Sequence, residues 1–142
     1  MVSSYLLAIV TAWVVAQGAK YLIEAVQTKS IRRFRQLYSS GDMPSAHTAS
    51  VVALATVIGL SEGVDSAIFA LSVLFASIIM YDAVMVRRSS GEQGAALQQL
   101  LKDLKSTIVN PRAAKGHTPQ EVLAGAVLGG VIGLVVFFAT QS

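Results

Sequence analysis

The sequence predicts an all-α membrane protein: a polytopic bundle of about four transmembrane helices with one further amphipathic helix on the cytoplasmic side. Two observations favour this fold class. Hydrophobic residues make up 54% of the 142 residues and charged residues only 13%, about half the charged fraction of a soluble domain. The 11 Lys and Arg residues fall in two blocks, with long apolar stretches before, between and after them. A chain of this length is one domain, covering 1–142.

The apolar stretches predict transmembrane helices at about 3–26, 44–60, 64–86 and 119–140. A helix needs about 20 apolar residues to cross a bilayer, with about 17 as the lower limit. The first and last stretches meet this length without a charged residue, and the two middle ones reach it with their flanks. The chain has no cysteine, which excludes disulfides and thiolate catalysis.

The charges of the connecting segments predict the orientation. Both basic blocks lie in loops, one after the first helix and one after the third, whereas the link between the middle helices carries only Glu62 and Asp65. Because Lys and Arg collect on the cytoplasmic side, we expect both basic loops inside and both termini outside. We expect an integral membrane protein, by default of a bacterial inner membrane, and no nucleic-acid partner.

The second basic loop has a helical pattern of its own. Apolar residues recur at helical spacing between 91 and 108, and they are Leu97, Leu100, Leu101, Leu104 and Ile108. This pattern is typical of an amphipathic helix that lies on the membrane surface. Such a helix either caps the bundle or guides lipid substrates, and amphipathicity does not separate these functions.

The two histidines of the chain each open a predicted membrane helix. Asp42 before His47 is a good N-cap, and Thr118 with Glu121 after His117 reads as a capping box. Both helices start on the cytoplasmic side, so both histidines are expected at one membrane face. Helix N-termini carry unpaired N–H groups and partial positive charge, which favours an anion such as phosphate.

The ends of the first and third helices reach the same face and bring further charged residues to it. Lys20 is a phosphate-binding candidate, although it could instead snorkel to the interface or pair with Glu24. Trp13 and Lys20 belong to one stripe with Gln17 and Glu24, and we expect this stripe to face the bundle interior. Histidines, cations and helix N-termini at one face favour phosphoryl transfer.

Two further features of the membrane helices predict contacts between helices. On an unbroken helix neither Arg87 nor Arg88 shares a face with Asp82, so we expect the partner of Asp82 on another helix. The glycines of the last helix recur every four residues at Gly125, Gly129 and Gly133. This spacing predicts close helix packing rather than a catalytic role.

Three segments give the sequence a specific resemblance: Met43-Pro44-Ser45-Ala46-His47, Met80-Tyr81-Asp82-Ala83 with Arg87-Arg88, and Gly116-His117-Thr118-Pro119-Gln120-Glu121-Val122. The chain resembles the divergent branch of the type 2 phosphatidic acid phosphatase superfamily. Members of this branch are also described as membrane proteins related to acid phosphatases and vanadium-dependent haloperoxidases. The resemblance covers nearly the whole chain.

The resemblance implies roles for individual residues. His117 would be the nucleophile that forms a phosphohistidine, Glu121 would orient it, and His47 would protonate the leaving oxygen. A neutral imidazole is nucleophilic near pH 7, and a carboxylate fixes its tautomer. The expected substrate-binding residues are Lys20, Ser45, Asp82, Arg87, Arg88, Arg112 and Lys115.

The function expected first is a membrane lipid-phosphate phosphatase acting at the cytoplasmic face. The resemblance implies phosphatidylglycerophosphate as substrate, because relatives in the divergent branch are linked to phosphatidylglycerol synthesis. Undecaprenyl or another polyprenyl pyrophosphate, and phosphatidic acid, are the alternatives. A protein that binds or transports lipid phosphates without catalysis remains a further alternative.

No cofactor or resident metal is expected for a phosphohistidine mechanism. A metal-dependent hydrolase is the other enzymatic alternative, in which Asp42, Asp82 and Glu121 would hold a divalent cation such as Mg²⁺. Membrane lipids are the expected partners together with the lipid phosphate. Four helices are fewer than the six typical of membrane enzymes in the superfamily, so we also expect that a homodimer could complete the site.

Overall fold

The computed structural model describes residues 3–28, 43–111, 113 and 116–141. These residues form helices and no strand, which confirms the all-α prediction. Along the chain the elements are α1 (Ser4–Thr28), α2 (Ala46–Glu62), α3 (Ala67–Tyr81), the π-helical turn η2 (Asp82–Val86), α4 (Arg87–Asp103) and α5 (Pro119–Thr140).

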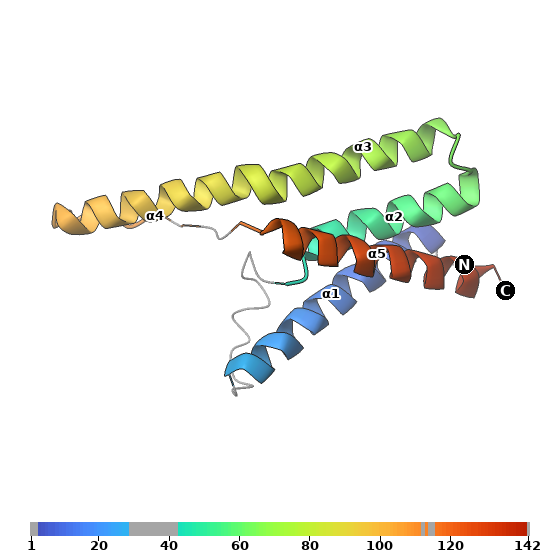
Figure 1. Ribbon diagram of the computed structural model, residues 1–142, viewed down its shortest axis with the longest axis horizontal. Helices are drawn as coiled ribbons and strands as arrows, with labels where there is room; N and C mark the ends of the chain where they lie inside the picture. Colours follow the sequence, from blue (N-terminus) through green and yellow to red (C-terminus); the bar gives the residue numbers. More distant parts are fainter. Residues whose placement is uncertain (1–2, 29–42, 112, 114–115, 142) are drawn as a thin grey trace.

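Helix α2 lies at the centre of the bundle, in contact with α1, α3 and α5, while α1 also packs against α5 (Figure 1). Small residues bring these helices together. A Cβ added to Gly125 would lie 2.5 Å from the Ser45 carbonyl oxygen, and one on Gly129 would lie 2.3 Å from that of Ala49. Only glycine allows this approach, so the prediction of close packing along α5 is confirmed.

The buried face of α1 is a stripe of small residues at four-residue spacing: Ala8, Ala12 and Ala16 are fully buried, and Lys20 continues the stripe. Trp13 is 46% exposed and points away from this face. The prediction that the stripe of Trp13 and Lys20 turns inward was therefore wrong for Trp13 and is confirmed for Lys20. Alanine allows α1 to approach α2 closely, whereas a bulky indole at the same contact would separate the two helices.

Within the part of the chain that the structure describes, three helical stretches are long and apolar enough to cross a membrane: Ser4–Val26, Ala67–Asp103 and Pro119–Thr140. Helix α2 is apolar but has only 17 residues, close to the lower limit of about 17 for a span. Large apolar side chains remain exposed along α1, α3 and α5. An apolar exterior of this kind fits lipid as the surrounding solvent, and the helices form a membrane bundle.

Helices α3 and α4 join through η2 into one long helix that extends well beyond the bundle (Figure 1). The sequence pattern predicted a separate helix at 91–108 on the membrane surface. Instead, α4 continues α3 and ends at Asp103, with Leu97 and Leu100 exposed. The reason is that no proline and no helix-ending glycine interrupts the chain at this junction, and η2 absorbs an extra residue without breaking the helix.

The two ends of the bundle differ in charge. The start of α1 and the end of α5 lie at the same end of the bundle as the link between α2 and α3 (Figure 1), where Glu62 and Asp65 flank Gly63. Gly63 ends α2 with a φ of 87°, a conformation that favours glycine. The starts of α2 and α5 lie at the opposite end, beside the junction of α3 and α4. This second end holds the candidate site.

Candidate active site

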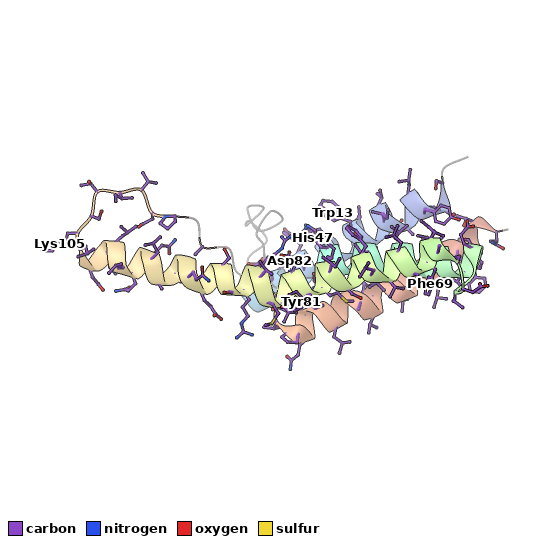
Figure 2. The ribbon with its side chains drawn as sticks, turned by 90° about the horizontal axis from the view of Figure 1, so that it is seen from above. Trp13, His47, Phe69, Tyr81, Asp82 and Lys105 are labelled. Atoms are coloured by element: carbon purple, nitrogen blue, oxygen red, sulfur yellow. The ribbon has the colours of Figure 1, made fainter. Side chains whose placement is uncertain are left out.

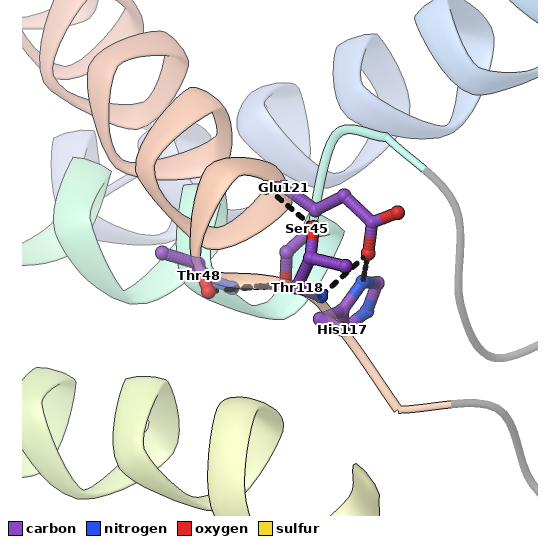
Figure 3. A network of polar contacts seen from close by, with 5 residues as sticks. All are labelled: Ser45, Thr48, His117, Thr118 and Glu121. Atoms are coloured by element: carbon purple, nitrogen blue, oxygen red, sulfur yellow. Dashed lines mark hydrogen bonds and ion pairs between the residues drawn. The ribbon is translucent and has the colours of Figure 1, made fainter.

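The start of α5 joins a helix cap to a histidine (Figure 3). Thr118 is the N-cap: its Oγ1 accepts a hydrogen bond from the Glu121 N–H at 3.3 Å, and its own N–H donates to Glu121 Oε2 at 2.9 Å. The capping-box prediction is confirmed. The same Oε2 lies 3.2 Å from His117 Nδ1. A carboxylate at Nδ1 favours the tautomer protonated there, which leaves the Nε2 lone pair for attack on an electrophile.

The backbone around His117 is held against the long helix. The His117 N–H donates to the Ala83 carbonyl oxygen in η2 at 3.1 Å. A Cβ added to Gly116 would lie 2.4 Å from the backbone N and Cα of Arg88. Only a glycine fits at this distance, so the segment before α5 lies directly on the helix backbone. His117 is therefore fixed through both its side chain and its main chain.

The start of α2 has a different cap from the one that the sequence predicted. Ser45, not Asp42, is the N-cap, and its Oγ accepts hydrogen bonds from the Thr48 N–H at 3.5 Å and from Thr48 Oγ1 at 3.0 Å. The Ser45 N–H donates to the Glu121 carbonyl oxygen at 3.2 Å, which connects the starts of α2 and α5. Ser45 and Thr48 are fully buried. Ser45 thus serves the cap and the helix contact. Because its side chain is fully buried, it offers no surface to a phosphate.

His47, the second residue of α2, is exposed and belongs to an electrostatic cluster (Figure 2). Its imidazole interacts electrostatically with Lys20, Asp82, Arg87 and His117. These residues come from α1, η2, α4 and the segment before α5. The fold therefore gathers most of the residues that the sequence analysis selected, although they are up to about a hundred positions apart in the chain.

Lys20 lies inside the bundle rather than at its surface. It is only 7% exposed and continues the alanine stripe of α1. The alternative in which Lys20 snorkels to the interface is therefore wrong. Burial of an ammonium in a membrane helix is costly unless negative charge lies nearby. The charge of Lys20 acts on both His47 and His117, which places Lys20 at the candidate site.

Burial lowers the pKa of His117 below the usual value for histidine, and the positive charges of Lys20 and Arg87 lower it further. The hydrogen bond and negative charge of Glu121 act in the opposite direction and only partly offset these effects. A lowered pKa keeps the imidazole neutral at pH 7. The side chain therefore has the protonation state that a nucleophile needs.

Arg87 pairs with Asp82 on its own helix, through Nε and Oδ2. The prediction that the partner of Asp82 comes from another helix was wrong. Residues five apart lie about 140° apart around an α-helix, but a π-helical turn closes with i→i+5 hydrogen bonds and brings them to one side. Asp82 begins this turn and Arg87, the first residue of α4, directly follows it, where the Arg87 N–H donates to the Asp82 carbonyl oxygen.

The neighbouring Arg88 has a different ion-pair partner from Arg87. Its Nε donates to Glu92 Oε1 at 3.1 Å, and the two side chains are 54% and 68% exposed. Arg88 also lines a cavity of about 410 Å³ that His117 borders. Arg87, unlike this exposed surface pair, interacts electrostatically with both His47 and His117.

Three selected residues, Asp42, Arg112 and Lys115, lie outside the described residues. Within the described ranges, no three His, Asp or Glu side chains are grouped so that they could hold a metal ion. Asp82 and Glu121, two residues of the metal-dependent alternative, instead contact Arg87 and His117.

Sequence reasoning missed the backbone partners of the site. The Ala83 carbonyl and the contact of Gly116 with Arg88 fix the histidine segment. A glycine directly before the histidine was the only signal for the second contact. No side-chain pattern could show that a main-chain carbonyl of a membrane helix would bind a distant N–H group.

A helical membrane bundle with a histidine–carboxylate pair among cationic side chains is the class of protein that the fold and the site define. Within this class the chain belongs to the Divergent PAP2 family, which matches residues 1–132. It is similar to the uncharacterized membrane protein YuiD of Bacillus subtilis (strain 168), with 34% identity over 148 residues that cover 94% of this chain and 93% of the relative. No solved structure matches the chain significantly. The resemblance to a divergent branch of the superfamily is confirmed.

Proposed function

We propose that this protein is a lipid-phosphate phosphatase of the membrane that converts phosphatidylglycerophosphate to phosphatidylglycerol through a phosphohistidine on His117. The observation that carries the proposal is the 3.2 Å contact between His117 Nδ1 and Glu121 Oε2. A carboxylate at one ring nitrogen prepares the other for nucleophilic attack. Membership of a phosphatase-like membrane family supports the reaction class.

In the first step, His117 Nε2 attacks phosphorus and forms an N–P bond. The bond between phosphorus and the glycerol oxygen breaks on the opposite side, and His47 donates a proton to that oxygen. The products are a phosphohistidine and the alcohol. Glu121 stabilises the positive charge that develops on the attacking imidazole.

In the second step, water attacks the phosphohistidine. His47, now neutral, accepts a proton from this water, the N–P bond breaks, and inorganic phosphate leaves. Lys20 and Arg87 supply positive charge for the phosphoryl oxygens in both steps. Neither of the two proposed steps uses a metal ion, so the proposed enzyme needs no cofactor.

The charges around the bundle support a cytoplasmic site. The end that holds the histidines also carries Arg87 and Arg88, and α4 beyond it carries Lys102. The opposite end carries Glu62 and Asp65. By the positive-inside rule, the site would face the cytoplasm of a bacterial inner membrane, where a lipid phosphate of the inner leaflet can reach it.

The test is phosphate release from phosphatidylglycerophosphate in mixed micelles by the wild type and His117→Ala, each with and without EDTA. We expect release by the wild type that is insensitive to EDTA and falls to background in the variant. The variant Glu92→Gln, which changes an exposed carboxylate on α4, is the control for effects of substitution at this end of the molecule.

Other outcomes distinguish the alternatives. Release that EDTA abolishes would replace the phosphohistidine scheme with a metal-dependent one. Release from a polyprenyl pyrophosphate or phosphatidic acid alone would keep the enzyme class and change the substrate. Binding of all three lipids by wild type and His117→Ala alike, without turnover, would indicate a non-catalytic binding protein.

A further inference from the structure

The π-helical turn η2 lies where the long helix passes the histidine segment, and it supports the site in two ways. It presents the Ala83 carbonyl oxygen to the His117 N–H at 3.1 Å. It also brings Arg87 to the same side of the helix as Asp82, where the Arg87 Nε donates to Asp82 Oδ2. Isolated π-helical turns within α-helices frequently occur at functional sites.

The contact between Asp82 and Arg87 leaves part of the guanidinium for a ligand. Arginine has five N–H donors, and the described contact uses only the one on Nε. The side chains of Arg87 and Asp82 are 44% and 32% exposed. A pair with this exposure adds little stability, but it holds the two terminal nitrogens of Arg87 in a fixed direction. Arginine binds phosphate best with two parallel N–H groups.

We propose that Asp82 is a positioning residue that holds Arg87 toward the phosphate beside His117, and that η2 is the structural device that makes this contact. Asp82 then touches neither the phosphate nor a metal ion. The inference rests on the proposed function, since it assigns a role within the same phosphate site.

The neighbouring pair provides a natural comparison. Arg88 and Glu92 have the same chemistry one residue further on, with ordinary i,i+4 spacing and greater exposure. Their contact is an ordinary surface pair of an α-helix. The pair of Arg88 and Glu92 therefore shows what loss of an acid and of its ion pair does on the same helix without the geometry of η2.

The sign of one substitution separates positioning from simple electrostatics. A carboxylate close to a phosphate repels it, so Asp82→Asn should strengthen phosphate binding if Asp82 acts only through its charge. If Asp82 positions Arg87, the same substitution should weaken phosphate binding. In an Arg87→Ala background, the weakening should disappear because the positioned group is gone.

The experiment measures the affinity of the full-length protein in detergent micelles for inorganic phosphate, by calorimetry. The variants are Asp82→Asn, Arg87→Ala, both together, and Glu92→Gln. We expect Asp82→Asn and Arg87→Ala each to weaken binding about tenfold, the effect of one lost charge-assisted hydrogen bond. The double variant should bind no more weakly than Arg87→Ala, and Glu92→Gln should match the wild type.

Thermal unfolding of each variant shows whether the fold is intact. Should Asp82→Asn fail to fold, Arg87→Lys provides the second test, because it keeps the charge but lacks the Nε–H that contacts Asp82. We expect Arg87→Lys to weaken phosphate binding nearly as much as Arg87→Ala does.

Three results would overturn the inference. Equal or tighter phosphate binding by Asp82→Asn, with lipid-phosphate hydrolysis by the wild type intact, would refute the positioning role and leave the proposed function standing. Additive losses in the double variant would give Asp82 a contact of its own with the ligand. A wild type that neither binds phosphate nor releases it from lipid would refute both proposals together.

Discussion

The starts of α2 and α5 are built alike but hold their histidines differently. Each helix has a hydroxyl N-cap, Ser45 in one and Thr118 in the other. The Ser45 cap is fully buried and His47 beside it is exposed, whereas His117 is buried and contacts the cap carboxylate Glu121. One histidine is therefore fixed and the other accessible, as expected for the proposed nucleophile and for a proposed proton donor that must also reach water.

Glu121 is the residue on which this difference depends most, because it serves the cap and the imidazole together. We expect Glu121→Gln to lower kcat about a hundredfold or more, since the imidazole loses the carboxylate that fixes its tautomer. The measurement is phosphate release from phosphatidylglycerophosphate at saturating lipid.

Thr118→Ala is the matched control for Glu121→Gln. It removes the hydroxyl of the cap, at a cost of about 1 kcal/mol in stability, and retains the contact between His117 and Glu121. Its activity should remain within a few-fold of the wild type. Equal losses in both variants would show that the cap, and not the contact with the imidazole, explains the role of Glu121.

Gly125 sets the distance between the two helix starts. A Cβ at this position would lie 2.5 Å from the Ser45 carbonyl oxygen, so we expect Gly125→Ala to destabilise the protein by about 1–3 kcal/mol through overpacking. Thermal unfolding in detergent measures this effect.

Gly130 on the same helix is the control, because a Cβ there meets nothing within 4 Å. Gly130→Ala should be neutral or stabilising by up to about 1 kcal/mol, from helix propensity. Equal stability of the two alanine variants would contradict the close contact between the helix starts.

The smallest expected effect is on pH dependence. Because burial lowers the pKa of His117, the acid limb of kcat/KM should lie below pH of about 6.5, the ordinary value for histidine. Activity requires the neutral imidazole, so it is lost as the pH falls through this lowered pKa.

Two variants should move the acid limb in opposite directions. Glu121→Gln removes a group that raises the pKa of His117, so the limb should move to lower pH. Lys20→Met removes a charge that lowers this pKa, so the limb should move to higher pH. If the acid limb moved in the same direction in both variants, a group other than His117 would control the pH profile.

Much of the fold could be predicted from the sequence, because each membrane helix is a long apolar segment bounded by charge or by a capping motif. The Thr118–Glu121 capping box was visible as a local pattern, and so was the glycine spacing of α5. The N-cap of α2 was misplaced because Asp42 and Ser45 both have side chains suited to the position.

The partner of Asp82 could not be predicted, because sequence periodicity assumes a regular helix. One π-helical turn changes which residues share a side, and neither Asp82 nor Arg87 reveals such a turn in advance. The prediction of a separate helix on the membrane surface was wrong for a related reason. Amphipathicity describes a helix face, but it does not determine whether the helix bends away from the preceding span.

The most direct test of the central claim is detection of phosphohistidine on His117. The wild type and His117→Ala would be mixed with phosphatidylglycerophosphate, quenched within milliseconds in alkali, which preserves phosphohistidine, and analysed by peptide mass spectrometry. We predict a phosphorylated peptide containing His117 in the wild type, formed in EDTA as well as without it. Phosphate release by the wild type without any phosphorylated histidine would contradict the account.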